Sequence, residues 1–388
     1  MNSGEHKKHA DLNRPALGNF GRNEWAIVGA PCVYIKGLAD KVIAALSPQY
    51  KCAYADTSHN DEMTTPPGRM ANGAWLEYAD QDNHQRFNYK SVSVPFGLRG
   101  KFSEADLVLV NGNHQQAKAQ VVIIHEDKRS SLQKRLEQLT DVQLILLAET
   151  SEDVFDFIKE SIPDWQAIPL YRLDETEKIV SFFQTKLEGA VPVLNGLVLA
   201  GGKSQRMGFD KGSVNWFGKE QRYFMADILE PFCGEVFISC REDQKGDIDS
   251  DYNVLPDTFT GLGPYGAILS AFREQPDSAW LVIACDLPLL DAVTIGYLVG
   301  QRDVSKIATA FNSPHDEFPE PLITVWEPKS YPVLLSFLSQ GYSCPRKALI
   351  NSDVRLLQAP DPAALTNVNT PEELETIKRV IHQKIAGV

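Results

Sequence analysis

The stretch Leu197-Val-Leu-Ala-Gly-Gly-Lys-Ser-Gln-Arg-Met-Gly-Phe-Asp-Lys211 decides the fold of the second half of the chain. It lies at the end of an apolar run, Val193 to Ala200, which is short enough to be a buried strand of a parallel sheet. Gly201 and Gly202 end that strand. Because they carry no side chain, their backbone N–H groups can approach a phosphate closely.

Two cations follow on the same loop, Arg206 and Lys211. A planar guanidinium suits a di- or triphosphate, and an ammonium acts as a point charge on one phosphoryl group. The loop is not a Walker loop, since Gly208 is followed by Phe209 rather than by Lys-Ser/Thr. It is not a G-x-G-x-x-G dinucleotide loop either. The pattern favours a phosphate-binding loop of another kind. The alternative is an ordinary turn after a strand, with cations exposed on the surface.

Carboxylates follow two more strands of the second half. Tyr252 to Asp257 reads as a strand that runs into an acidic loop, and Trp280 to Leu290 carries Asp286 at the end of a buried strand. Sheets of α/β proteins place ligand sites at the carboxyl ends of their strands. The alternatives are that Asp257 forms a turn and that Asp286 caps a helix.

The last recognisable segment is Thr366-Asn-Val-Asn-Thr-Pro-Glu-Glu-Leu374. Thr370 and Glu373 have the spacing of a capping box, so a helix is predicted to begin here. The two asparagines, Asn367 and Asn369, remain as candidates for a functional role.

Four separate motifs of this half, in the right order, resemble the molybdenum cofactor guanylyltransferases, the MobA family. They are L-A-G-G-x-S-x-R-M-G-x-D-K at the first loop, the glycine-proline segment after Asp257, C-D-x-P at Asp286 and N-x-N-T-P-E-E-L at Asn367. The resemblance covers about residues 194–382. It implies a Rossmann-like nucleotidyltransferase with a mostly parallel sheet. It also implies transfer of GMP from GTP to molybdopterin, or to its molybdenum-loaded form, with release of pyrophosphate.

The resemblance assigns roles to single residues. Asp257 would recognise guanine, and Asp286 would bind a Mg²⁺ ion that bridges the triphosphate. Arg206 would hold the β- and γ-phosphates, and Lys211 would stabilise the α-phosphoryl group; with Asp286 these two are the expected catalytic residues. The expected nucleotide-binding residues are Leu199, Ala200, Gly201, Gly202, Lys211, Asp257 and Asp286. The candidates for the second substrate are Arg346, Lys347, Asn367 and Asn369, although the basic pair fits a solvated helix start equally well.

The first half opens with a strand, Glu24 to Ala30, and a helix, Leu38 to Leu46. The loop between them, Gly29 to Lys36, lacks the second glycine and the Lys-Ser/Thr of a P-loop. With the segment Ala105-Asp-Leu-Val-Leu-Val-Asn-Gly112, this half loosely resembles the MobB family with its P-loop lost. We therefore expect a degenerate P-loop-like α/β domain with a structural or docking role.

The expected organisation is a mobile tail at residues 1–22, the MobB-like domain at 23–185, a linker at 186–194 and the MobA-like domain at 195–388. The chain has 388 residues and a formal net charge of −13, which argues against a nucleic-acid partner. An acidic protein that binds an anionic substrate favours Mg²⁺. None of the six cysteines forms a C-x-x-C pair and no apolar leader or membrane segment is evident, so we expect a cytoplasmic protein that does not contact membranes.

The expected partners are GTP and molybdopterin or Mo-molybdopterin, with molybdoenzyme apo-proteins as further candidates. Three other functions stay open on the sequence. The first is a cytidylyl- or sugar-phosphate nucleotidyltransferase of the same fold. The second is a non-catalytic adaptor that binds the cofactor. The third is GTP hydrolysis by the first half, which the lost lysine loop disfavours.

Overall fold

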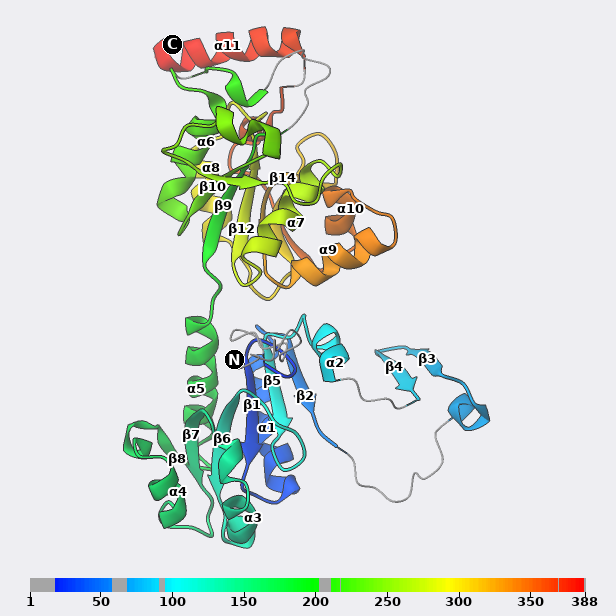
Figure 1. Ribbon diagram of the computed structural model, residues 1–388, viewed down its shortest axis with the longest axis vertical. Coiled ribbons are helices and arrows are strands. Elements are labelled where there is room, and N and C mark those ends of the chain that lie inside the picture. Colours follow the sequence, from blue (N-terminus) through cyan, green and yellow to red (C-terminus); the bar gives the residue numbers. More distant parts are fainter. Residues whose placement is uncertain are drawn as a thin grey trace, which may run out of the picture. The chain divides into compact units, whose positions relative to one another are not determined.

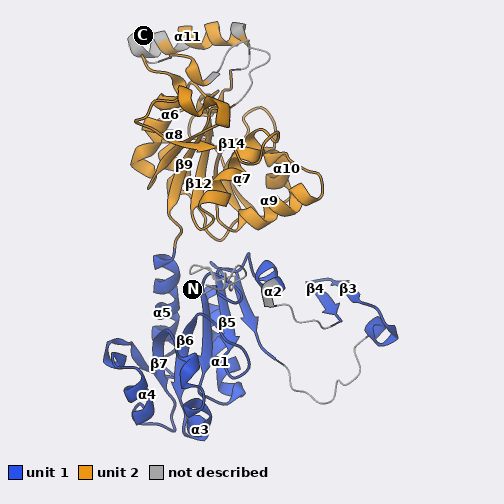
Figure 2. Ribbon diagram, in the orientation of Figure 1, with its two compact units in different colours: residues 1–190 blue, residues 191–388 orange. Residues whose placement is uncertain are grey.

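The computed structural model describes residues 18–57, 68–90, 95–201, 211–216, 218–368 and 370–386. The chain divides into two compact units, Met1–Ala190 and Val191–Val388 (Figure 2). Each unit is an α/β structure around its own sheet (Figure 1). Among the helices of the described ranges, none is long and apolar enough to cross a membrane.

The first unit is built on a six-stranded parallel sheet in the order β2-β5-β1-β6-β7-β8. Its strands are β1 (Glu24–Val28), β2 (Cys52–Ala55), β5 (Leu107–Asn111), β6 (Ala119–Ile124), β7 (Val142–Leu147) and β8 (Leu170–Arg172). Its main helices are α1 (Cys32–Leu46), α3 (Arg129–Gln133), α4 (Asp156–Ser161) and α5 (Thr176–Gly189). Ile27 and Ile123 belong to a core with α1 and α5, whereas Val28 and Val122 belong to a core with α3 and α4. Burial on both faces explains why these strands are continuous apolar runs.

The remaining elements of this unit are short. A separate hairpin pairs β3 (Leu76–Gln81) with β4 (His84–Tyr89), and α2 (Pro95–Lys101) follows it. The 3₁₀ turns are η2 (Gly68–Asn72), η3 (Glu126–Lys128), η4 (Leu136–Gln138) and η5 (Trp165–Ala167).

The connection after β1 is shorter than predicted. We expected a loop from Gly29 to Lys36 and a helix from Leu38, but α1 already begins at Cys32. Pro31 stands before the helix with an extended backbone, which starts the helical turn at the next residue. Gly29 has a φ of 94°, and a Cβ there would meet the carbonyl oxygen of Ile123 at 2.4 Å. The chain therefore turns straight into the helix, and no glycine-rich loop remains that could surround a phosphate.

Two predicted boundaries are wrong. Part of the expected tail, residues 18–22, packs against the sheet: Phe20 is buried, and the carboxylate of buried Glu24 accepts hydrogen bonds from the N–H groups of Asn19, Phe20 and Gly21. A buried carboxylate requires such donors, and this segment supplies them. The expected linker at 186–194 is also partly helical, because α5 continues to Gly189, where its apolar residue Leu187 is still buried.

The second unit has a seven-stranded sheet in the order β11-β10-β9-β12-β14-β13-β15. Its strands are β9 (Leu194–Leu199), β10 (Val236–Cys240), β11 (Asn253–Pro256), β12 (Ala279–Ala284), β13 (Ala308–Asn312), β14 (Pro319–Trp326) and β15 (Val354–Leu357). The pairings are parallel except for the two made by β14, so the expected α/β class with a mostly parallel sheet is confirmed.

Helices cover both faces of this sheet. They are α6 (Gln221–Leu229), α7 (Pro264–Glu274), α8 (Ala292–Gly300), α9 (Ser330–Ser339) and α10 (Pro345–Ile350). A further helix, α11 (Pro371–Ala386), packs instead against Val214, Trp216 and Leu289. The 3₁₀ turns are η6 (Lys211–Ser213), η7 (Glu230–Phe232), η8 (Glu242–Asp247) and η9 (Pro362–Leu365). Val198 and Ile283 face α6 and α8, whereas Leu197 and Val282 face α7 and α9. Thr370 and Glu373 exchange the two hydrogen bonds of the predicted capping box at the start of α11, each 3.2 Å long.

A buried ion pair holds the first residues of this unit. Arg302 donates from Nε and Nη2 to the two carboxylate oxygens of Glu327 at 2.6 and 2.8 Å. The same guanidinium donates to the carbonyl oxygen of Pro192 at 3.0 Å. The side chain of Glu327 is only 1% exposed, and within the described ranges Arg302 is the cation that offsets its charge.

We predict that Arg302→Met lowers the free energy of unfolding of this unit by about 3–5 kcal/mol, because Glu327 would be left buried without its counter-charge. The matched control is Lys306→Met, which removes an exposed pair with Asp353 (2.8 Å) and should cost only about 0–1 kcal/mol. Urea denaturation of the full chain measures both values. Similar losses in the two variants would contradict the importance of the buried pair.

Candidate active site

Four neighbouring parallel strands of the second unit, β11, β10, β9 and β12, end at the same edge of the sheet. Leu199 of β9 lies opposite Ser239 of β10 on one side and Ala284 of β12 on the other. Cys240 of β10 lies opposite Pro256 of β11. The residues that follow these strand ends therefore emerge side by side at one edge: Gly201, Arg241, Asp257 and Asp286. Ligands of α/β proteins bind at such an edge.

The first glycine of the pair makes a close approach to the neighbouring loop. A Cβ on Gly201 would meet the Cα of Cys240 at 3.2 Å and the N of Arg241 at 3.3 Å. Its carbonyl oxygen accepts a hydrogen bond from Arg241 Nη1 at 3.1 Å. Arg241 also donates from Nε to Asp243 Oδ1 at 2.9 Å. Arg241 thus joins the end of β9 to the loop after β10, and its positive charge at this edge is shared with Asp243, which it also contacts from Nη2 at 3.2 Å.

Asp257 is fixed by two contacts with β10. Its backbone N–H donates to the carbonyl oxygen of Cys240 at 2.8 Å, and its Oδ1 accepts a hydrogen bond from the Ser239 hydroxyl at 2.7 Å. Burial raises the pKa of this carboxyl group, while the Ser239 hydrogen bond and the Arg241 charge oppose the rise. The side chain is therefore an oriented acceptor, and it does not merely form a turn.

Asp286 lies in the turn after β12 and is partly exposed. Its backbone carbonyl accepts a hydrogen bond from Val368 N at 2.9 Å, which brings the segment before α11 to the same edge. The helix-capping role that was the alternative for Asp286 is filled by another residue. Asp291 caps α8, where its Oδ1 accepts from Thr294 N at 2.8 Å.

The segment before α11 borders a pocket of about 560 Å³. Asn367 lines this pocket and is next to Val368, which contacts Asp286. The volume falls in the usual range for small-ligand pockets, about 300–1,000 Å³. The complete lining is His315, Glu320, Leu365, Thr366, Asn367, Glu372, Glu373, Thr376 and Ile377.

The structure gives different surroundings to Arg346 and Lys347, the two basic residues of α10 that were predicted to contact the second substrate. Arg346 donates to Asp316 Oδ2 at 3.1 Å and to Glu320 Oε2 at 3.2 Å, so its charge is already shared between two carboxylates beside the pocket. Lys347 is exposed and its Nζ lies 5.8 Å from the ring centroid of Tyr342. Consecutive helical residues point in different directions, which explains why the pair does not act as one cluster.

Several predicted residues lie outside the described part of the chain. These are Gly202, Arg206 and Asn369. Lys211 begins η6, and its side chain is not described. Sequence reasoning missed Ser239, His315 and Glu320. The hydroxyl of Ser239 carried no sequence signal, because its importance comes from pairing with a strand that follows it in the chain.

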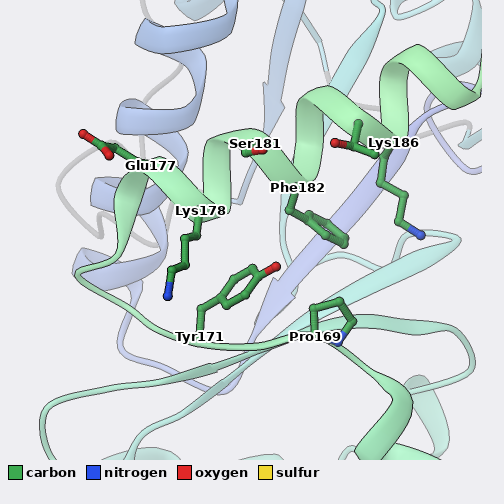
Figure 3. A pocket seen from close by; sticks show the side chains of 8 residues that line it. Pro169, Tyr171, Glu177, Lys178, Ser181, Phe182 and Lys186 are labelled. Carbon is green, nitrogen blue, oxygen red and sulfur yellow. The ribbon is translucent and has the colours of Figure 1, made fainter.

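The first unit has a separate groove of about 530 Å³ between β8 and α5 (Figure 3). Tyr171 and Phe182 contribute aromatic rings, and Lys178 and Lys186 carry charges at its border. Lys178 is already paired with Glu175, since its Nζ lies 2.6 Å from Oε1. The groove contains none of the residues expected for the nucleotide.

Within the described residues, no group of three or more His, Cys, Asp or Glu side chains is arranged to hold a metal ion. A single carboxylate at a strand end, such as Asp286, is compatible with Mg²⁺. That ion usually takes one or two protein carboxylates and completes its shell with substrate phosphates and water.

The sequence of the second unit is similar to those of known proteins. The model of the MobA-like NTP transferase domain matches residues 196–355. A "Molybdenum cofactor biosynthesis bifunctional protein" from Synechocystis sp. is 33% identical over 181 residues, which are 46% of this chain and 52% of that protein. The chain therefore spans about half the length of this relative. A "Molybdenum cofactor guanylyltransferase" from Pseudomonas putida is 30% identical over 198 residues, or 48% of this chain and 98% of that protein.

Two solved structures are also similar. The Archaeoglobus fulgidus molybdopterin-guanine dinucleotide biosynthesis protein A has a TM-score of 0.42 at 21% identity and covers 49% of this chain and 99% of its own. A MobB protein homolog from Bacillus stearothermophilus has a TM-score of 0.31 at 16% identity and covers 43% of this chain and 99% of its own. The family itself rests on the sequence matches, because the chain covers nearly the whole of a guanylyltransferase at 30% identity. This chain belongs to the molybdenum cofactor guanylyltransferase family, a group of nucleotidyltransferases.

Proposed function

We propose that this chain transfers GMP from GTP to the phosphate of molybdopterin, or of its molybdenum-loaded form, and releases pyrophosphate. The observation that carries the proposal is the row of Gly201, Arg241, Asp257 and Asp286 along one sheet edge. This row offers a close backbone approach, a cation and two carboxylates within one contiguous site. The names of the relatives favour guanylyl transfer over the cytidylyl and sugar-phosphate alternatives.

The chemistry needs little from the protein apart from position and charge. The attacking phosphate is already an anion at neutral pH, so no general base is required. Binding both substrates at one edge supplies orientation, and the nearby charges stabilise the transferring phosphoryl group. We assign the phosphates of GTP to Arg206 and Lys211, which follow the glycine pair in the sequence. Leu199, Ala200, Gly201 and Gly202 would supply the backbone beside the base and phosphates.

We assign the guanine base to Asp257. An ionised carboxylate can accept hydrogen bonds from both N–H groups of the guanine edge. The Ser239 hydroxyl, 2.7 Å from Oδ1, holds the carboxylate in place, and the nearby Arg241 favours its ionised form. A cytosine ring presents a different pattern of donors and acceptors, so the same carboxylate discriminates against CTP.

We assign a Mg²⁺ ion to Asp286, whose partly exposed carboxylate fits a cation that substrate phosphates also bind. When bound there, the ion supplies positive charge to the α-phosphate and the leaving pyrophosphate. Asp286 fixes the position of that charge relative to the glycine pair, because β9 and β12 are neighbours.

We place molybdopterin on the Asn367 side of Asp286, where the pocket of about 560 Å³ lies. The amide of Asn367 can donate and accept hydrogen bonds with a pterin ring. Asn369 and Lys347 are further candidates at this side. Arg346 orients the pocket residue Glu320 through its hydrogen bond, so we assign it a positioning role.

The full chain, given Mg²⁺ and each of the four NTPs, is expected to release pyrophosphate only with GTP and only when molybdopterin is present. A coupled pyrophosphate assay measures this directly. Release with CTP would keep the enzyme class but overturn the assignment of Asp257. Nucleotide binding without release by any NTP would favour a non-catalytic adaptor.

We predict that Asp286→Ala lowers Mg²⁺-dependent turnover by about 100-fold or more, the usual effect of removing a group that stabilises transition-state charge. The matched control is Asp291→Ala, at the cap of α8, which should cost about 1 kcal/mol of unfolding free energy and leave turnover unchanged. Pyrophosphate release titrated with Mg²⁺ measures the difference. Unchanged turnover in Asp286→Ala would overturn the metal assignment.

We predict that Asp257→Asn lowers kcat/KM for GTP by roughly 5- to 150-fold, the equivalent of about 1–3 kcal/mol for one bidentate contact to a base. The pKa of Asp257 is raised, so in the parent enzyme the preference for GTP should fall as the pH falls, beginning at a higher pH than for an ordinary aspartate. The Asn variant should lack this dependence. Asp353→Asn, on the surface, serves as the control, and a parent-like pH profile in Asp257→Asn would contradict the assignment.

A further inference from the structure

The carboxyl edge of the first sheet carries a second group of reactive and polar side chains. The chain passes from β1 to β2 on one side of the sheet and later crosses β1 to reach β6 on the other. This is a topological switch point, where α/β sheets form a ligand crevice. Cys32 follows β1, Asp56 follows β2, Asn111 ends β5 and is followed by Gly112–His114, and His125 follows β6.

A thiol and an imidazole meet at this edge. Cys32 Sγ lies 3.3 Å from His114 Nε2, and Asn113 Nδ2 lies 3.8 Å from the same sulfur. His114 Nε2 is also 4.0 Å from Asp56 Oδ1. Cys32 is the first residue of α1, a helix of 15 residues, and it is partly exposed. His114 Nε2 is within hydrogen-bonding distance of the thiol, and in a neutral ring it can accept the thiol proton.

One buried hydrogen-bond donor beside this pair has no partner among the described residues. His125 is 1% exposed, and its Nδ1 accepts from Asp127 N at 3.3 Å. In a neutral ring Nε2 then carries the proton, and this nitrogen is unpaired. Asn111 is also fully buried, but its side chain is held: Oδ1 accepts from Asn113 N at 3.1 Å, and the side-chain amide is hydrogen-bonded to Asp56.

His125 lies close to the start of α1: its ring packs against Tyr34, two residues after Cys32, at 4.9 Å between centroids. Asn111 lies beside Asp56: burial alone would raise the pKa of Asp56, but the Asn111 hydrogen bond, the Thr57 N–H and Lys36 together lower it. Leaving a buried donor unpaired destabilises the fold. A site that keeps such a donor is suited to a ligand that accepts a hydrogen bond.

The charges at this edge favour an anionic ligand. Lys36 Nζ lies 3.3 Å from Asp56 Oδ2 and remains more than half exposed. Arg135 Nη1 lies 3.3 Å from the carbonyl oxygen of Gly112 and 3.3 Å from Asn113 Oδ1. Asp56 is the negative group, Tyr54 donates to it at 3.2 Å, and Lys36 offsets its charge.

We propose that Cys32 and His114 form a thiol-exchange site for small disulfides that carry carboxylates. His114 takes the proton of the Cys32 thiol, and the thiolate attacks one sulfur of the disulfide. A new S–S bond forms to Cys32, the original S–S bond breaks, and the leaving thiolate receives the proton from His114. The products are a mixed disulfide on Cys32 and one free thiol, so atoms, protons and electrons balance. Lys36, Arg135 and the buried Nε2–H of His125 receive the carboxylates.

The other cysteines provide internal controls. All six are free thiols. Burial raises the pKa of Cys52 to about 11, that of Cys233 to about 12 and that of Cys240 to about 11. Cys285 is buried. Cys344 is exposed, and no histidine among the described residues is hydrogen-bonded to it, so it reports the reactivity of an ordinary surface thiol.

The test treats the full chain with oxidised glutathione, which is anionic, or with cystamine, which is cationic, and follows each cysteine by peptide mass spectrometry. Cys32 should react with oxidised glutathione at least about tenfold faster than Cys344 at neutral pH. His114→Gln should remove this advantage and leave Cys344 unchanged. Equal rates for the two cysteines, or a Cys32 rate unaffected by His114→Gln, would overturn the proposal.

A second variant tests the ligand class without disturbing a buried residue. Lys36→Gln, at an exposed side chain, should slow the reaction of Cys32 with oxidised glutathione several-fold and leave its reaction with cystamine unchanged or faster. Cys344→Ser is the control for the background. A preference of Cys32 for cystamine over oxidised glutathione would overturn the assignment of an anionic disulfide.

Discussion

The parallel pairing of β9 with both β10 and β12 is the constraint on which the nucleotide site depends. Three separate segments of the second unit end at one edge because Leu199 lies opposite both Ser239 and Ala284. A shift of one residue would turn every side chain of a strand to the other face, and the apolar burial of both faces opposes that shift. The register therefore places Gly201 and Asp286 on neighbouring strand ends without any direct contact between their side chains.

The polar groups of this edge carry a small desolvation cost because they lie beyond the buried strands, where the sheet ends. Trp280 and Ile283 of β12 are fully buried, whereas Asp286, beyond the strand, is partly exposed. Asp257 lies deeper, and the cost appears as its raised pKa, which Ser239 and Arg241 limit. The same gradient from apolar strand to polar edge allows charged groups to meet a charged substrate while the core beneath them stays rigid.

The first unit is also built on a parallel sheet, but different side chains lie at the carboxyl edge of that sheet. Its strand β1 is also followed by a glycine, but the chain passes from Gly29 through Ala30 and Pro31 into α1, so the described residues form no phosphate-binding loop there. In its place the start of the helix brings Cys32 next to His114, with the buried His125 nearby. The carboxyl edge of this sheet therefore carries a thiol and an imidazole where the second unit carries glycine and carboxylates.

The sequence by itself determined the features that depend on neighbours along the chain. The α/β class, the strand before Gly201, the carboxylates at strand ends and the capping box of Thr370 and Glu373 follow from periodicity and short spacing, which act within a few residues. Only the tertiary structure decided which distant groups meet. Ser239 reaches Asp257, and Arg346 is shared between Asp316 and Glu320. These contacts depend on strand order and helix direction, and long-range packing sets both.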